Sequence, residues 1–98
     1  MKENLENLVV EFTNYAAKMY SSVFNQFHSS IRNINRAEEE NVFKMQISKY
    51  SFELQKRLEQ HAKLLADSHP AAYRQIESAL SEKIKYYLKA FWQKCVAL

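Results

Sequence analysis

Glycine is absent from this chain of 98 residues, and proline occurs once. Glycine normally supplies the positive φ angles of tight turns, hairpins and phosphate-binding loops. Its absence therefore disfavours β-rich folds, P-loops and dinucleotide-binding fingerprints together. A single cysteine excludes an internal disulfide framework and a multi-cysteine zinc site. Apolar residues make up 47% of the chain, which is enough for the core of one small all-α domain over residues 1–98.

Three segments repeat their apolar residues at the helical interval of 100° per residue. Each segment forms one stripe, and the stripes predict helices over about residues 3–33, 36–67 and 70–97. The first stripe contains Leu5, Leu8, Val9, Phe12, Ala16, Met19, Tyr20, Val23, Phe27 and Ile34. The second contains Phe43, Ile47, Tyr50, Leu54, Leu58, His61 and Leu65. The third contains Tyr73, Ile76, Leu80, Ile84, Tyr87, Leu88, Phe91, Cys95 and Leu98.

The two breaks between these segments carry signals of different strength. Pro70 fits only the first turn of a helix, so Ser68 or His69 is expected to be the N-cap of the third helix. Asparagines cluster around residues 33–36 and predict a tight turn there, with Asn35 and Glu38 as a capping box. The alternative is one continuous helix over residues 4–67, about 95 Å long at ~1.5 Å per residue, which would be stable only in an oligomer.

Short connections between long amphipathic helices predict an antiparallel up-down-up three-helix bundle. The bundle is either closed within one chain or completed by oligomerisation, with the first helix exchanged between chains. Both alternatives fit the same three stripes.

Several apolar residues lie off the stripes. We interpret five of them as a candidate interface: Met45, Phe52, Tyr86, Trp92 and Val96. Met45 and Phe52 lie about 180° from the second stripe by the 100° rule, and Tyr86 lies almost opposite the third. Trp92 and Val96 lie on the flank of the third stripe, while Val10 and Phe24 flank the first. A wide, curved core could collect some of these side chains. A surface for a partner, most simply another copy of the chain, explains all of them.

The last third of the chain is basic, with five basic and two acidic residues in 71–98 against four and six in 1–40. Lysines alternate there with Tyr and Trp, a pattern typical of helices that lie in an interface. Its candidate contacts for an anionic surface are Lys83, Lys85, Lys89 and Lys94. A solvated helix face explains the same lysines. Arginine occurs four times, spread along the chain, and the helices are too long for a helix-turn-helix, so nucleic acid is not the expected partner.

No residue pattern indicates catalysis, a metal or a cofactor, so we expect a protein that is not an enzyme. His61 falls in a core stripe and is expected to be a buried, hydrogen-bonded imidazole. Cys95 falls in the third stripe and is expected to act as a small hydrophobe. The first residues contain no apolar signal-peptide region and no run reaches the ~20 apolar residues of a membrane span, so we expect a cytoplasmic protein with no transmembrane segment.

The stretch from Leu54 to Tyr73, LQKRLEQHAKLLADSHPAAY, resembles phasins, the proteins that coat storage-polyester granules in bacteria. The shared pattern is a long amphipathic helix, a small-polar-Pro break and another helix. The chain departs from phasins in being richer in aromatic residues and poorer in Ala and Gln. The resemblance implies a non-enzymatic protein that lays amphipathic helices on a hydrophobic surface and self-associates, and it assigns no site residues.

The leading interpretation is a non-enzymatic helical interaction or assembly module that forms a homo-oligomer through its off-stripe apolar residues. A phasin-like coat on a hydrophobic granule or membrane surface is the second. A small basic helical protein that binds nucleic acid or has a regulatory role is the third.

Overall fold

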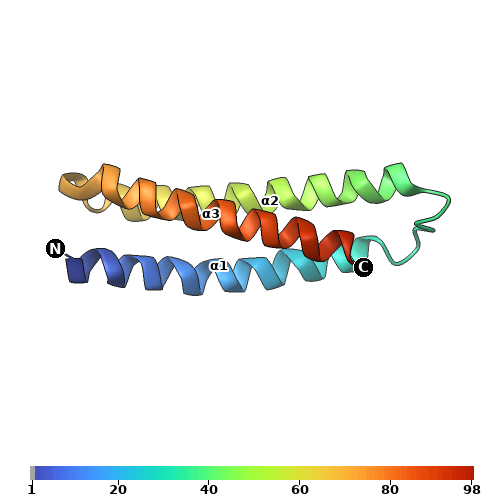
Figure 1. Cartoon of the computed structure of the whole chain (residues 1–98), viewed down its shortest axis with the longest axis horizontal. Coiled ribbons are helices and arrows are strands. Elements are labelled where there is room, and N and C mark those ends of the chain that lie inside the picture. Colours follow the sequence, from blue (N-terminus) through green and yellow to red (C-terminus); the bar gives the residue numbers. More distant parts are fainter. Residues whose placement is uncertain (1) are drawn as a thin grey trace.

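The structure is a computed structural model that describes residues 2–98, with side chains described from Leu5 onward. Three helices, α1 (Lys2–Ser30), α2 (Glu40–Asp67) and α3 (Tyr73–Val96), alternate in direction along one rod (Figure 1). The Cα atoms extend over 53 × 17 × 16 Å. All three helices contact one another, and residues 2–98 contain no strand. The predicted all-α three-helix bundle is therefore confirmed.

The core consists of stripe residues that the helical period selects. Leu98 is an exception: the third stripe includes it, but it is 45% exposed, because α3 ends at Val96 and Leu98 lies beyond it. The largest core side chains of zero exposure include Phe12, Phe27, Phe91, Leu54 and Leu58. The other buried apolar residues are Leu8, Ala16, Val23, Phe43, Ile47, Leu65, Ala66, Ile76, Leu80, Ile84 and Cys95. Ala66 is the one member that none of the three stripes included. No polar side chain among the described residues is fully buried, so apolar burial supplies the main driving force for folding.

Helix α3 crosses the bundle obliquely: it starts along α2 and ends beside α1 (Figure 1). At the α1 side the hydroxyl of Tyr20 donates to the carbonyl of Ala90 at 3.4 Å. Phe91 meets Phe24 and Phe27 edge to face, with ring centroids 6.3 and 6.4 Å apart. This aromatic contact fixes the end of α3 against α1, because such pairs add to the energy of burial.

The break near residues 33–36 is confirmed, but the helices end farther apart than predicted. α1 ends at Ser30 rather than 33, and α2 begins at Glu40 rather than 36. The Ser30 hydroxyl donates to the carbonyl of Phe27 at 2.7 Å, and the backbone N–H of Ile31 donates to the same carbonyl at 3.2 Å. The nine connecting residues contain two turns, and Ile34 still packs against the core from within them.

The expected capping box at Asn35 and Glu38 is wrong. The Asn35 side chain accepts from the backbone N–H of Ala37 at 3.1 Å, so it stabilises a turn inside the connection. The residue at the N-cap of α2 is Glu39, whose side chain makes no capping bond. Without glycine, these turns form at negative φ, and the described residues include none at positive φ.

The second break lies where Pro70 predicts it. Pro70–Ala72 form one 3-10 turn, η1, and α3 begins at Tyr73 rather than at 70. His69 precedes the turn without a side-chain capping bond. The Ser68 hydroxyl donates back to Leu64 at 2.8 Å, so neither predicted N-cap residue caps the third helix through its side chain.

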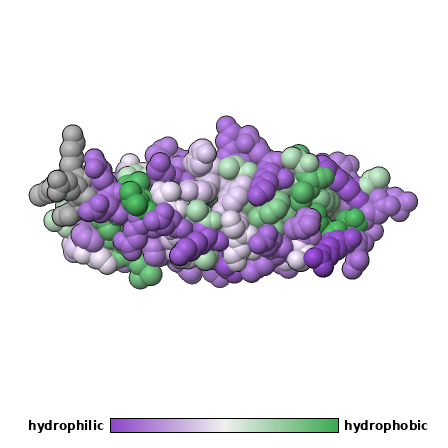
Figure 2. All heavy atoms as spheres, turned by 90° about the horizontal axis from the view of Figure 1, so that it is seen from below, coloured by the Kyte–Doolittle hydropathy of each residue, from purple (hydrophilic) through white to green (hydrophobic). Residues whose placement is uncertain are grey.

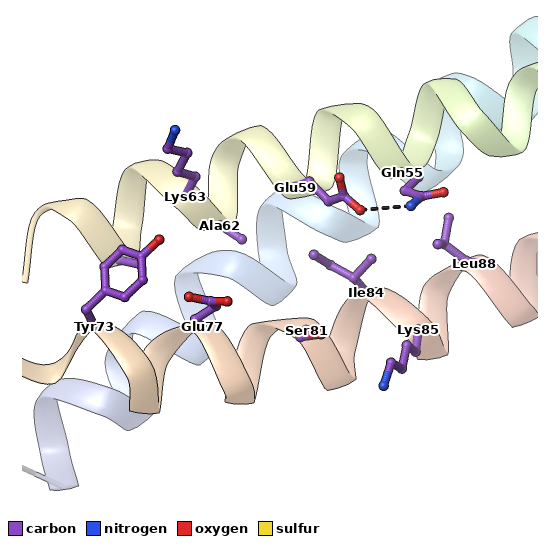
Figure 3. Close-up of a pocket in the computed structure, with 11 residues that line it drawn as sticks. Gln55, Glu59, Ala62, Lys63, Tyr73, Glu77, Ser81, Ile84, Lys85 and Leu88 are labelled. Atoms are coloured by element: carbon purple, nitrogen blue, oxygen red, sulfur yellow. Dashed lines mark hydrogen bonds between the residues drawn. The ribbon is translucent and has the colours of Figure 1, made fainter.

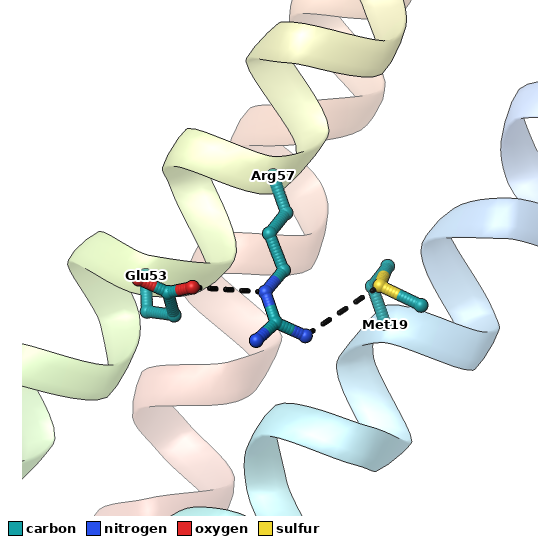
Figure 4. A network of polar contacts seen from close by, with 3 residues as sticks. All are labelled: Met19, Glu53 and Arg57. Atoms are coloured by element: carbon teal, nitrogen blue, oxygen red, sulfur yellow. Dashed lines mark hydrogen bonds and ion pairs between the residues drawn. The ribbon is translucent and has the colours of Figure 1, made fainter.

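Two arginines join elements at the surface of the bundle. Arg57 of α2 pairs with Glu53 at 2.9 Å and reaches the Met19 sulfur of α1 at 3.8 Å (Figure 4). Arg36 donates to the carbonyls of Val96 and Leu98, each at 2.8 Å, and lies over the ring of Phe43. Arg36 therefore connects the 31–39 segment to the end of α3 and the start of α2. None of the helices described in residues 2–98 has the length and apolar character of a membrane span.

Candidate interaction surface

The α2 patch consists of Met45 and Phe52, whose side chains are 68% and 65% exposed. They lie seven residues apart, two turns of helix, on the face of α2 that points away from the core. Asn41, Lys44, Ser48 and Lys49 surround them in a shallow depression. Such large exposed fractions for an aromatic and a thioether side chain on one line leave apolar area available to a partner.

The α3 patch consists of Tyr86, Trp92 and Val96, which are 67%, 42% and 44% exposed. Tyr86 packs edge to face on Tyr87 with ring centroids 5.6 Å apart. The rest of its ring faces solvent. All five predicted interface residues are thus exposed, on two helices rather than in one cluster of contacting side chains. Their role in binding stays a prediction.

The four lysines near the α3 patch have different surroundings. Lys94 lies 4.2 Å above the ring of Phe24 and 5.4 Å from that of Tyr20, so it packs against α1. Lys85 pairs with Glu82 at 3.7 Å in an exposed contact, which contributes little. Lys83 and Lys89 are exposed and form no ion pair within residues 5–98. The structure therefore leaves Lys83 and Lys89 available to anions and engages Lys94 elsewhere.

Charge is separated along the rod. The end formed by residues 17–53 and 83–98 carries nine basic and four acidic side chains. The other end, formed by residues 5–16 and 54–82, carries four basic and six acidic ones. Seen from below in Figure 2, the larger apolar area lies toward the basic end and a smaller one near the N-terminal end. The basic end of the molecule is thus also the end that shows more apolar surface from this side.

A groove of about 400 Å³ runs between α2 and α3 (Figure 3). Small side chains at Ala62, Ala66 and Ser81 leave the space, and two carboxylates and two lysines stand at its edges. Glu59 accepts from the amide of Gln55 at 2.8 Å. The nearby charge of Glu77 raises the pKa of the Tyr73 phenol, with burial adding to the effect. This groove could not be predicted from the sequence, because its residues come from two helices whose contact no local pattern specifies.

The chemistry-bearing side chains are dispersed. Cys95 is buried, and its desolvation raises the pKa of the thiol to about 12, although Lys94 acts in the opposite direction. Within the described residues no three His, Cys, Asp or Glu side chains are placed to hold a metal ion. Because of its raised pKa, the Cys95 thiol stays protonated near neutral pH and is a poor nucleophile.

His61 differs from its prediction. It is half-buried rather than buried, and its ring lies flat on Tyr15 with centroids 3.9 Å apart. Its Nε2 atom is buried without a hydrogen-bond partner in the described part of the chain. The expected hydrogen-bonded imidazole is therefore wrong, because the rings of Phe12 and Tyr15 stack on the imidazole and present their faces to it.

Comparisons with protein-family models, curated proteins and solved structures found no match for this chain.

Proposed function

We propose that the chain is a non-enzymatic helical interaction module that self-associates, with the α2 patch as a contact surface. The observation that carries the proposal is the exposure of Phe52 and Met45 on the face opposite the core. The three helices already bury fifteen stripe residues without them. These two side chains are therefore not needed for the core, and their apolar area is free to be buried in an assembly.

The energy available from the off-core residues suits a modest association. Burial of several large side chains contributes a few kcal/mol per chain at ~25 cal/mol per Å² of apolar area. Loss of translational and rotational freedom opposes this by several kcal/mol. We therefore expect association at micromolar or higher concentrations, strengthened if the α3 patch also contacts a partner.

The test is the molar mass in solution across a concentration series, measured by light scattering for the wild type and Phe52→Asp. We expect the wild type to exceed the monomer mass and Phe52→Asp to remain closer to it at equal concentration. Ser48→Asp is the matched control, because it adds the same charge on the same face without removing apolar area. A wild type that stays monomeric throughout the series contradicts the proposal.

A second candidate function is a phasin-like coat on a hydrophobic surface. It is favoured by the α3 patch, whose exposed Tyr86 and Trp92 share a helix with the exposed Lys85 and Lys89. Aromatic rings with flanking lysines suit a boundary between water and an apolar phase. Co-sedimentation with polyester granules or lipid droplets, lost in Trp92→Asp, is the expected result. No co-sedimentation of the wild type with either would reject this function.

A further inference from the structure

The outer face of α1 differs from those of α2 and α3 in its low charge. Charged residues occupy three of the twelve exposed positions in residues 5–30, against seven of fourteen on each of the other helices. Between Glu11 and Arg32, Lys18 is the sole Lys, Arg, Asp or Glu. The cores of protein interfaces are depleted in charged residues, because buried charges must be desolvated. The charge pattern therefore marks α1 as the helix whose outer face is most readily covered.

The α1 seam is a set of residues spaced alternately three and four apart on this face. Its members are Asn7, Val10, Asn14, Ala17, Ser21, Phe24 and His28. This is the heptad spacing of helices that pack along one another, and it extends over about 32 Å at ~1.5 Å per residue. Val10 is 58% exposed and Phe24 is half-buried, while the other five are exposed. Neither α2 nor α3 covers the lower side of α1 in Figure 1.

The residue types of the seam are unusual for a helix face that only meets water. Asn and Ser are poor helix formers, and a solvated face is normally filled with Glu, Lys, Gln or Ala. Asn at the first heptad position is a known device for fixing register and partner number in packed helices. Asn7 and Asn14 occupy that position here, and the apolar Val10, Ala17 and Phe24 occupy the fourth.

Charge complementarity indicates which partner fits. Glu11 and Lys18 lie seven residues apart on the same edge of the seam, and both are exposed. A second α1 packed antiparallel, with Asn14 opposite the partner's Ala17, brings Glu11 beside the partner's Lys18. The two-fold axis repeats this attraction as a second pair. In a parallel arrangement, Glu6 would instead approach the partner's Glu11, which is repulsive.

We infer that the α1 seam is the two-fold contact of an antiparallel homodimer, held in register by two Glu11–Lys18 pairs between chains. The inference rests on the proposed self-association but uses another face of the molecule. Helix α3 is less suited to such symmetry, because residues 83–98 contain four lysines and no acidic residue. An α3–α3 contact would place like charges together. None of the five residues of the α2 and α3 patches belongs to the α1 seam.

The test measures the dissociation constant of self-association at low salt by sedimentation velocity, using the full chain. Glu11→Lys and Lys18→Glu should each weaken association about tenfold, because two attractions become two repulsions. The double variant Glu11→Lys/Lys18→Glu should return to within about twofold of wild type, since the antiparallel pairs are restored. An equimolar mixture of the two single variants should form heterodimers. Arg74→Glu, an exposed change at the start of α3, controls for net charge.

Cross-linking identifies the orientation. Mixed Asn14→Cys and Ala17→Cys chains should form a disulfide between the two variants, whereas Asn14→Cys alone should form few 14–14 cross-links. The native Cys95 does not compete, because it is buried with a raised pKa. Efficient 14–14 cross-linking, or charge variants that associate like wild type, would overturn the inference.

The two proposals fail in different ways. If Phe52→Asp dissociates the oligomer and the charge variants do not, the α2 contact stands and the α1 contact is rejected. If the charge variants dissociate it and the double variant rescues it while Phe52→Asp has no effect, the α1 contact stands alone. A chain that is monomeric at every concentration rejects both.

Discussion

The guanidinium of Arg36 donates to the backbone carbonyl of Leu98 at 2.8 Å, joining residues 62 positions apart in the sequence. A second bond of the same length reaches the carbonyl of Val96. The last carbonyls of a helix have no partner within the helix, and they carry its negative dipole end. Val96 is the last residue of α3, and Leu98 lies two residues beyond it. Arg36 therefore satisfies one such carbonyl and also binds the carbonyl of Leu98, which ties the 31–39 segment to the end of α3.

Arg36→Gln should therefore loosen the end of α3. We expect a loss of about 1 kcal/mol in the free energy of unfolding, because the contact is charge-assisted but exposed. Urea denaturation measures the loss, and amide exchange should accelerate in residues 94–98. Arg36→Lys keeps the charge without the planar fork and should fall between wild type and Arg36→Gln. Equal stability of all three chains would show that the contact contributes nothing.

His61→Phe should stabilise the protein by roughly 1 kcal/mol, because it removes a buried polar atom without a partner. The phenyl ring keeps the shape that stacks on Tyr15. The melting temperature, measured by circular dichroism, should rise. A fall would mean that Nε2 gains a hydrogen-bond partner in solution, and His61→Leu would then fall further.

Neighbouring positions on α2 should respond very differently to truncation. Leu54 has zero exposure, so Leu54→Ala should destabilise the chain by about 2–5 kcal/mol. Phe52 lies two residues away and is 65% exposed. Phe52→Ala should change the stability of the monomer by less than about 0.5 kcal/mol. Thermal denaturation at the lowest workable concentration compares them, and similar losses in both variants would contradict the arrangement of α2.

Stability should decrease in alkaline solution. Burial raises the pKa of the Cys95 thiol to about 12, and it also raises the pKa values of Tyr20 and Tyr87. The unfolded chain therefore releases these protons at lower pH than the folded chain does. Stability is fully present below about pH 9 and is lost as the pH rises toward 12. Urea unfolding at about pH 7 and pH 10 measures the slope, which Cys95→Ala should reduce.

The fold was predictable because one physical signal dominates this sequence. Core residues such as Phe12, Leu58 and Phe91 recur at the helical interval, and each has zero exposure in the structure. The residues left off the stripes could be predicted as exposed for the same reason, as Met45 and Tyr86 show. Ala66 escaped prediction because it lies about 100° around the helix from Leu65, outside the second stripe.

The parts that sequence could not predict depend on contacts between segments. Helix α1 ends at Ser30 rather than at 33, and Asn35 stabilises a turn rather than capping α2. Both outcomes are choices among local bonds of similar energy. The position of Lys94 over Phe24 could not be predicted, because it depends on the oblique course of α3. The unpaired state of His61 Nε2 could not be predicted, because it depends on which aromatic rings pack around the imidazole.

The separation of basic and acidic side chains along the rod gives the molecule an electric dipole parallel to its long axis. Each end attracts the opposite end of another copy, and the basic end approaches any anionic surface first. Two copies that approach each other are thus oriented by their charges before any specific contact forms. The bias is set by charges tens of ångströms apart and weakens as added salt shortens the range of their field.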